Sequence, residues 1–283
     1  MSAQGTAHSA AGAARGAGDS DTLENLARIG LIAYGLVHVL VAWLALQLAW
    51  FGGNGKSADQ SGAMSTLADS PVGKPLLWLL AIGLIALAVW QAAEIFRWRS
   101  RWSASGKTRT KAIRKSGNAL IKAVIYAALA VLAIKFAIGS GTSSSQKQQQ
   151  TTAGVFSWPA GRWLVAIAGL VLIGSGIWHV RKGLTKKFLK QIDTSKASPS
   201  ALKLVTRLGQ VGFPGKGVAL VGVGVLLIWA AVTFDPSKAR GLDGAMHAIL
   251  DLPFGEILLT LVALGIAAFG AFLFVRARYP ERT

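Results

Sequence analysis

The chain has 283 residues, of which 52% are hydrophobic, and it carries a formal net charge of +18. It contains no cysteine, which excludes disulfides, thiolate metal sites and cysteine nucleophiles. Its apolar residues form long runs that are apolar on all sides, whereas a soluble helical domain shows polar residues at a period of about 3.6. The composition therefore excludes an ordinary soluble helical domain.

The chain begins with a segment rich in Ala, Gly and Ser, residues 1–25, which we expect to be a disordered cytoplasmic tail. Six apolar runs follow, and their lengths are typical of membrane spans, because crossing about 30 Å of hydrocarbon takes about 20 helical residues. The third run is shorter, but Lys122 and Lys135 near its ends can extend their ammonium groups to the interfaces. The runs are 29–55, 75–93, 123–134, 163–180, 217–234 and 257–275.

The six runs form three copies of one two-helix pattern. Each copy has a proline at the same distance from its start and a glycine two residues later, and the copies are offset by 88 and then 94 residues. Proline suits the start of a helix and glycine allows close backbone approach, so the motif predicts where each second helix begins. The matched positions are Gly30, Pro71 and Gly73; Asn118, Pro159 and Gly161; and Gly212, Pro253 and Gly255.

This register predicts an all-α integral membrane protein in which six transmembrane helices form three parallel two-helix repeats with pseudo-threefold symmetry. Each repeat contains two spans, so all three enter the membrane in the same orientation, and parallel repeats are related by an axis along the membrane normal. The expected units are repeat 1 at 26–98, a basic linker at 99–115, repeat 2 at 116–182, a basic linker at 183–207 and repeat 3 at 208–279.

Basic residues are concentrated in two alternate connections. Residues 97–115 contain eight Lys and Arg and no acid, and residues 181–207 contain eight against the single Asp193. The positive-inside rule therefore places these connections and both termini in the cytoplasm. Nucleic acid is the alternative partner for a basic run. The charges lie beside span ends, where topology alone requires them, so we expect contact with anionic lipid headgroups and no nucleic acid.

Two connecting segments have patterns of their own. In 184–192 the apolar residues fall at helical spacing and the lysines take the other face, which predicts an interfacial helix. The segment 140–152 is rich in Ser and Gln, and we expect it to be disordered.

The third copy contains DLPFG at 251–255 and the first contains DSPVG at 69–73. With GFPGKGV at 212–218, these motifs resemble a bacterial family of three-repeat, six-span membrane proteins, catalogued as domain of unknown function 1206, over about residues 26–279. The resemblance implies the fold and a location in the bacterial cytoplasmic (inner) membrane, and it implies no reaction. Members typically have a basic residue early in each repeat and an aromatic residue four positions later. In this chain the first of these two positions is occupied by Tyr34, Lys122 and Lys216. The position four residues later is occupied by His38, Tyr126 and Leu220.

Few polar residues lie inside the predicted spans. His38 is about ten residues into the first span, which places it roughly 15 Å deep, near the midplane. An ionisable residue at that depth is a candidate functional residue, and the alternative is a neutral imidazole that hydrogen-bonds a facing helix. Tyr126 occupies the matched position, and Gln47 is a further polar residue of the first span. We expect His38 and Tyr126 to face the bundle interior.

Two classes of function follow from this organisation. Repeats around a central cavity favour a transporter-like bundle or one that binds a small ligand or lipid. The alternative is a non-catalytic membrane scaffold or envelope accessory protein, whose basic loops hold a membrane protein partner or lipid. Catalytic motifs and metal-ligand spacing among the four histidines are missing from the sequence, so we expect no cofactor and no metal, and an enzyme is the least supported class.

Overall fold

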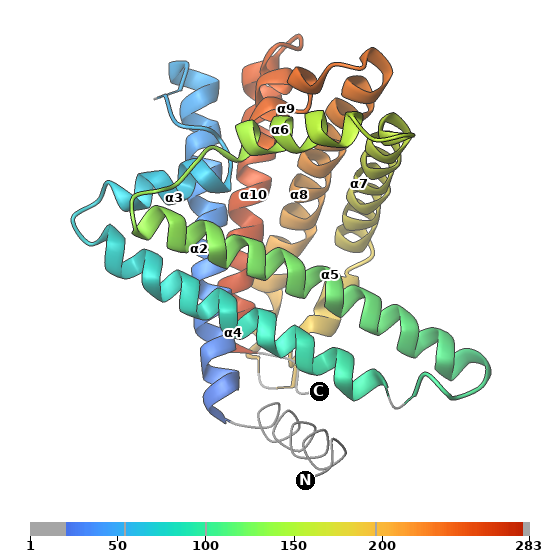
Figure 1. Cartoon of the computed structure of the whole chain (residues 1–283). Helices are drawn as coiled ribbons and strands as arrows, with labels where there is room; N and C mark the ends of the chain where they lie inside the picture. Colours follow the sequence, from blue (N-terminus) through green and yellow to red (C-terminus); the bar gives the residue numbers. More distant parts are fainter. Residues whose placement is uncertain (1–20, 54, 100, 196, 280–283) are drawn as a thin grey trace.

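The computed structural model describes residues 21–53, 55–99, 101–195 and 197–279, and this part of the chain is helical (Figure 1). Residues 1–20 of the predicted tail lie outside the described residues, and the first described helix already begins at Asp21. The helices are α2 (Asp21–Phe51), α3 (Gln60–Ala68), α4 (Gly73–Arg99), α5 (Gly106–Ala137), α6 (Ser144–Phe156), α7 (Gly161–Leu184), η1 (Lys187–Gln191), α8 (Pro199–Thr233), η2 (Pro236–Lys238), α9 (Gly241–Leu250) and α10 (Gly255–Arg278).

Six of these helices, α2, α4, α5, α7, α8 and α10, are apolar and long enough to cross a membrane. The prediction of six spans is therefore confirmed, and the chain is a multi-pass membrane protein. Helices α5 and α8 begin within the expected linkers 99–115 and 183–207, well before the apolar runs that start at 123 and 217. The start of α8 has a local cause: the Ser198 hydroxyl accepts a hydrogen bond from the Ala201 N–H, and Pro199 occupies the first turn.

Each second span begins at the glycine of the Pro-x-Gly motif. The N–H of that glycine donates to the carbonyl of the residue before the proline, at 2.9 Å in every copy. Proline thus takes the second position of a tight turn, where its fixed φ fits. The predicted starts are confirmed, and the hydrogen-bonded pairs are Gly73 with Ser70, Gly161 with Trp158, and Gly255 with Leu252.

A short helix precedes each of these turns, and α6 is the one in the second repeat. The expectation that residues 140–152 are disordered is therefore wrong. The Ser145 hydroxyl donates to the Arg240 carbonyl at 2.7 Å, and the Gln149 side-chain amide donates to the Ser237 carbonyl at 3.4 Å. The Ser and Gln side chains that suggested disorder thus hold α6 against the connection between η2 and α9.

The most extensive helix contacts join neighbouring repeats. The second span of one repeat packs along the first span of the next: α4 on α5, α7 on α8, and α10 on α2. Within repeats, α2 packs on α4 and α8 on α10, whereas in the described part of the chain α5 and α7 form no comparable contact. In Figure 1, α4 and α5 run obliquely across the other four spans. The two spans of the second repeat, α5 and α7, are therefore not packed against each other.

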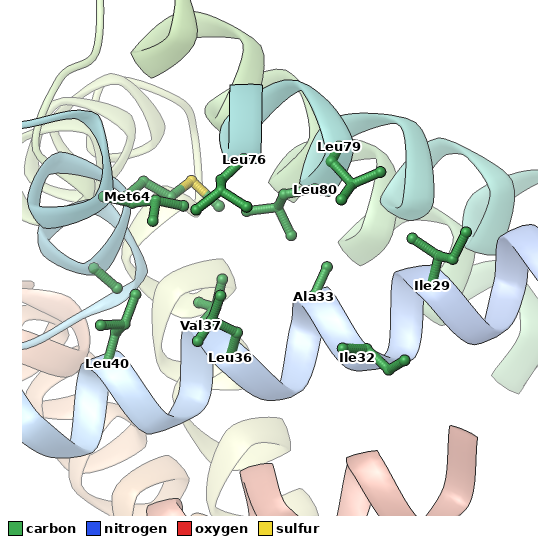
Figure 2. A pocket seen from close by; sticks show the side chains of 12 residues that line it. Ile29, Ile32, Ala33, Leu36, Val37, Leu40, Met64, Leu76, Leu79 and Leu80 are labelled. Carbon is green, nitrogen blue, oxygen red and sulfur yellow. The ribbon is translucent and has the colours of Figure 1, made fainter. Parts of the chain in front are cut away.

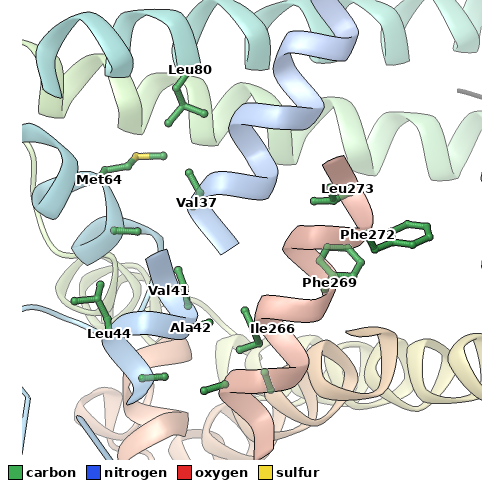
Figure 3. Packing of buried hydrophobic residues seen from close by; sticks show 14 of the residues in the cluster. Val37, Val41, Ala42, Leu44, Met64, Leu80, Ile266, Phe269, Phe272 and Leu273 are labelled. Carbon is green, nitrogen blue, oxygen red and sulfur yellow. The ribbon is translucent and has the colours of Figure 1, made fainter. Parts of the chain in front are cut away.

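The hydrophobic core is centred on α2 and α10, and α3, α4, α5 and α8 also contribute to it (Figure 3). Phe188 of η1 also belongs to this core: it is fully buried, and its ring lies 5.3 Å from that of Phe213 and 5.6 Å from that of Phe272. The expected interfacial helix at 184–192 is instead a short 3-10 helix. Because Phe188 and Ile192 are buried, protein covers much of the apolar face that was assigned to lipid.

Polar contacts between the short helices connect all three repeats. The Ala58 N–H donates to Asp243 Oδ1 at 2.7 Å, and the Ser144 N–H donates to Ser61 Oγ at 3.0 Å. The Ser61 hydroxyl in turn donates to Asp59 Oδ1 at 2.5 Å. Asp59 is 1% exposed, and its Oδ2 has no hydrogen-bond partner among the described residues. Burial raises the pKa of the Asp59 carboxyl above its ordinary value of 3.8, and the charge of Asp243 raises it further.

We predict that Asp59 makes the protein less stable as the pH rises. A carboxyl with a raised folded-state pKa binds more protons in the folded than in the unfolded state, so its contribution is most favourable below pH 3.8 and is lost as the pH rises through the folded-state pKa. Asp59→Asn should remove this contribution. The check is the difference in unfolding midpoint between the wild type and the variant from pH 4 to 7, and a difference that does not change with pH contradicts the prediction.

A basic centre among aromatic rings as the candidate functional site

Residues from two sets of matched repeat positions interact with one another. The first spans contribute Tyr34, Lys122 and Lys216, and the ends of the second spans contribute Glu94, Lys182 and Arg276. Lys182 interacts electrostatically with Arg276, Lys122 and Lys216, and Lys122 with Arg276 and Glu94. We call the four cations of this group, Lys122, Lys182, Lys216 and Arg276, the basic centre.

The cations of the basic centre outnumber the acids near them in the described part of the chain, where Glu94 alone is seen to attract one of them, Lys122. Among the described residues, no carboxylate forms an ion pair with any of the four. Glu94 is the acid at the matched position, but its carboxylate pairs with Arg97 and accepts a hydrogen bond from Trp98 Nε1 at 2.7 Å. The centre therefore has an excess of positive charge inside an apolar protein.

Lys216 is partly buried and lies midway along α8, two residues after Pro214. Its ammonium group donates to the Tyr34 hydroxyl at 3.3 Å and lies 4.2 Å from the centre of the Phe269 ring. Because the Tyr34 oxygen is the acceptor in this bond, its own hydrogen can be donated to another group. Lys216 and Tyr34 thus present two donors side by side.

Lys182 has a similar setting at the end of α7. It is 8% exposed, and its ammonium group lies 4.5 Å from the centre of the Phe213 ring and 5.1 Å from that of Trp178. The rings of Phe213 and Phe269 pack edge to face at 5.2 Å, so the buried Lys182 and the partly buried Lys216 lie on adjoining aromatic rings. Cation–π attraction offsets part of the cost of burying these charges.

The structure places His38 and Tyr126 inside the bundle, as expected, at 5% and 9% exposure. His38 Nδ1–H donates to the Tyr34 carbonyl at 2.9 Å, and the His38 ring lies 4.4 Å from the Tyr34 ring. The Tyr126 ring lies 5.6 Å from that of Tyr34, so the rings of Tyr34, His38 and Tyr126 form a cluster beside Lys216. Gln47 does not join them, because it lies thirteen residues beyond Tyr34 on α2, about 20 Å away along the helix.

Sequence reasoning missed the role of Lys182 and Arg276. Lys182 was counted among the charges of 181–207 that set the topology, and Arg276 was not singled out. The repeat register could have identified both residues. The offsets of 88 and 94 residues that match Tyr34 with Lys122 and Lys216 also match Glu94 with Lys182 and Arg276. Two matched sets of polar residues at corresponding depths predict a common site.

The chemistry of this arrangement favours the binding of an anion. Ammonium and guanidinium groups and a phenolic hydroxyl are hydrogen-bond donors, and charge-assisted bonds from such groups suit phosphate and carboxylate oxygens. The site presents these donors on a rigid aromatic support.

A separate apolar cavity of about 280 Å³ lies between α2, α3 and α4. Figure 2 shows Ile29, Leu36 and Leu40 of α2 on one side, with Leu79 of α4 and Met64 of α3 on the other. Every lining residue is apolar, and none belongs to the basic centre. The cavity has room for an apolar chain but no polar group that would select a ligand.

Comparison with known proteins agrees with the internal repeats. The family described as Domain of Unknown Function (DUF1206) matches three times, at 29–96, 118–186 and 211–280. The chain is also 30% identical over 261 residues to the Uncharacterized protein YxxB of Bacillus subtilis (strain 168), which covers 92% of each chain. No solved structure matches. The three matches follow the register of the Pro-x-Gly turns, and the chain belongs to the family Domain of Unknown Function (DUF1206).

Proposed function

We propose that the protein is a ligand-binding or transporter-like membrane bundle that holds a small anionic ligand of the phosphate type at the basic centre. The observation that carries this proposal is the convergence of four cations without a described carboxylate partner. The Tyr34 hydroxyl and the two lysines on aromatic rings supply oriented donors for such a ligand.

A purely structural role explains only part of the basic centre. Lys182 and Arg276 lie in the last turns of α7 and α10, where long basic side chains can reach a membrane surface. Lys216 is midway along α8, and an unpaired charge in that position costs free energy. A group that destabilises the protein without its ligand is typical of a binding site.

We predict that Lys216→Met has opposite effects with and without ligand. In detergent without added anion, the variant should be more stable than the wild type by on the order of 1 kcal/mol, because a buried unpaired charge is removed. Inorganic phosphate should stabilise the wild type, by about 2.7 kcal/mol at a concentration 100 times the Kd, and leave the variant unchanged. Unfolding midpoints measured across a phosphate titration test both effects.

The matched control is Lys135→Met, which removes the same charge near the other end of α5. Its phosphate response should equal that of the wild type. A Lys216→Met protein that is less stable than the wild type and still responds to phosphate contradicts the proposal, and that result would favour the membrane scaffold.

We also propose that the membrane is the bacterial cytoplasmic membrane, with both termini and the two basic connections in the cytoplasm and the three repeats related by an approximate threefold axis. The convergence of matched positions on the basic centre supports the axis. The absence of native cysteine permits a direct test of orientation. In intact cells a membrane-impermeant maleimide should label Gln146→Cys and should label Ser103→Cys only after lysis, and the reverse pattern contradicts this orientation.

A further inference from the structure

We infer that the anionic ligand is a phospholipid, which reaches the basic centre sideways from the bilayer through the opening between α5 and α7. This inference rests on the proposed function and names the source of the anion. It is carried by the packing of the spans, by the exposure of Lys122, and by the position of the cations relative to the helix ends.

One pair of consecutive spans is not packed together. α5 packs along α4 and touches α3, and α7 packs along α8, but α5 and α7 form no extensive contact in the described part of the chain. In Figure 1, α5 runs obliquely to α7, and its first half extends beyond the lower end of α7. The other consecutive spans pack against each other, so this is the place where a ligand can enter without separating packed helices.

Lys122 is exposed and interacts with cations of the bundle interior. It is exposed on α5, yet it interacts electrostatically with Lys182 and Arg276, which lie on α7 and α10. Lys182 is buried and interacts in turn with Lys216. The four cations therefore extend from the exposed side of α5 to the middle of the bundle, and an anion bound by Lys122 can be passed to the buried donors.

The surroundings suit a lipid better than a free anion. Lys182 and Arg276 lie in the last turns of their spans, at the depth where a headgroup phosphate would sit. The surfaces beside the opening are apolar, with Ile121 and Ile125 exposed on α5 and Ile177 exposed on α7. Acyl chains would lie against these side chains while the phosphate reaches the cations, and basic pockets between spans bind lipid headgroups in this way.

The test uses the full-length protein in nanodiscs that contain equal parts of phosphatidylglycerol and phosphatidylcholine. The protein is released in mild detergent, and retained lipids are counted by native mass spectrometry. We expect phosphatidylglycerol to be retained at least about tenfold more than phosphatidylcholine. Lys122→Gln and Lys182→Gln should abolish this preference, whereas Lys135→Gln, which changes the same residue type on the same helix as Lys122, should preserve it. Glycerol 3-phosphate, which carries the headgroup phosphate without acyl chains, should not displace the retained lipid at concentrations at which inorganic phosphate stabilises the protein in detergent.

The outcomes separate this inference from the proposed function. If inorganic phosphate stabilises the protein through Lys216 but phosphatidylglycerol is not preferred, the ligand is a free anion and the lipid inference is overturned while the proposed function stands. A preference that survives both Lys122→Gln and Lys182→Gln reflects lipid bound elsewhere and also overturns the inference. If neither phosphate nor phosphatidylglycerol binds, both proposals are overturned.

Discussion

Gly161→Ala is expected to destabilise the protein by about 3 kcal/mol, at the upper end of the usual cost of overpacking. An added Cβ would lie 1.8 Å from the Val155 carbonyl oxygen, which is a backbone atom of α6 and cannot rotate away. The same change at Gly73 and Gly255 would place the Cβ 1.7 Å from the Leu67 carbonyl oxygen and 1.9 Å from the Leu250 carbonyl oxygen. The three single variants should therefore lose similar amounts of unfolding free energy, measured by denaturant titration in mixed micelles.

Gly154→Ala in α6 is the control for this series. Nothing lies within 4 Å of a Cβ at that position, so its unfolding free energy should stay within about 0.5 kcal/mol of the wild type. A Gly161→Ala variant as stable as Gly154→Ala would show that α6 and the following turn can separate at low cost. Three unequal losses would show that the matched glycines do not share one role.

The Pro-x-Gly motif shows why much of the fold could be predicted. A turn that needs proline at one position and glycine two residues later is determined by local geometry, and such constraints are visible in a single sequence. The spans were predictable for a similar reason, because their length is set by bilayer thickness. The sequence did not show that each glycine also lies against a carbonyl of the preceding short helix. It did not show α6 either, because the Ser- and Gln-rich composition of that segment suggested disorder.

Pairing between neighbouring repeats was not predictable from the same pattern. Each repeat contains two spans, which suggested the pair as the unit, yet α4 packs along α5 and α10 along α2. Periodicity cannot distinguish these arrangements, since spans that are apolar all round do not indicate which face meets which partner. His38 and Tyr126 were placed in the interior from depth alone. Lys216 was aligned with Tyr34 and Lys122, but nothing local in the sequence shows that its ammonium group reaches the Tyr34 hydroxyl.

Glycines at the contact between α7 and α8 provide the second test of large effect. An added Cβ on Gly176 would lie 2.5 Å from the Gly217 carbonyl oxygen, and one on Gly217 would lie 2.6 Å from the Gly176 carbonyl oxygen. Lipid supplies no hydrophobic force between spans, so close backbone contact of this kind is a main source of their association. We expect Gly176→Ala to lower the unfolding free energy by about 1 to 3 kcal/mol.

Gly174→Ala is a closely matched control, because it makes the same change two residues earlier on α7, where nothing lies within 4 Å of the added Cβ. It should leave stability within about 0.5 kcal/mol of the wild type. The Gly176 contact also sets the distance between Lys182 on α7 and Lys216 on α8, so Gly176→Ala should weaken the stabilisation by phosphate as well, and Gly174→Ala should not. If both variants lost the same unfolding free energy, alanine would be unfavourable on either face of α7. The prediction that the close α7–α8 contact supports the basic centre would then be wrong.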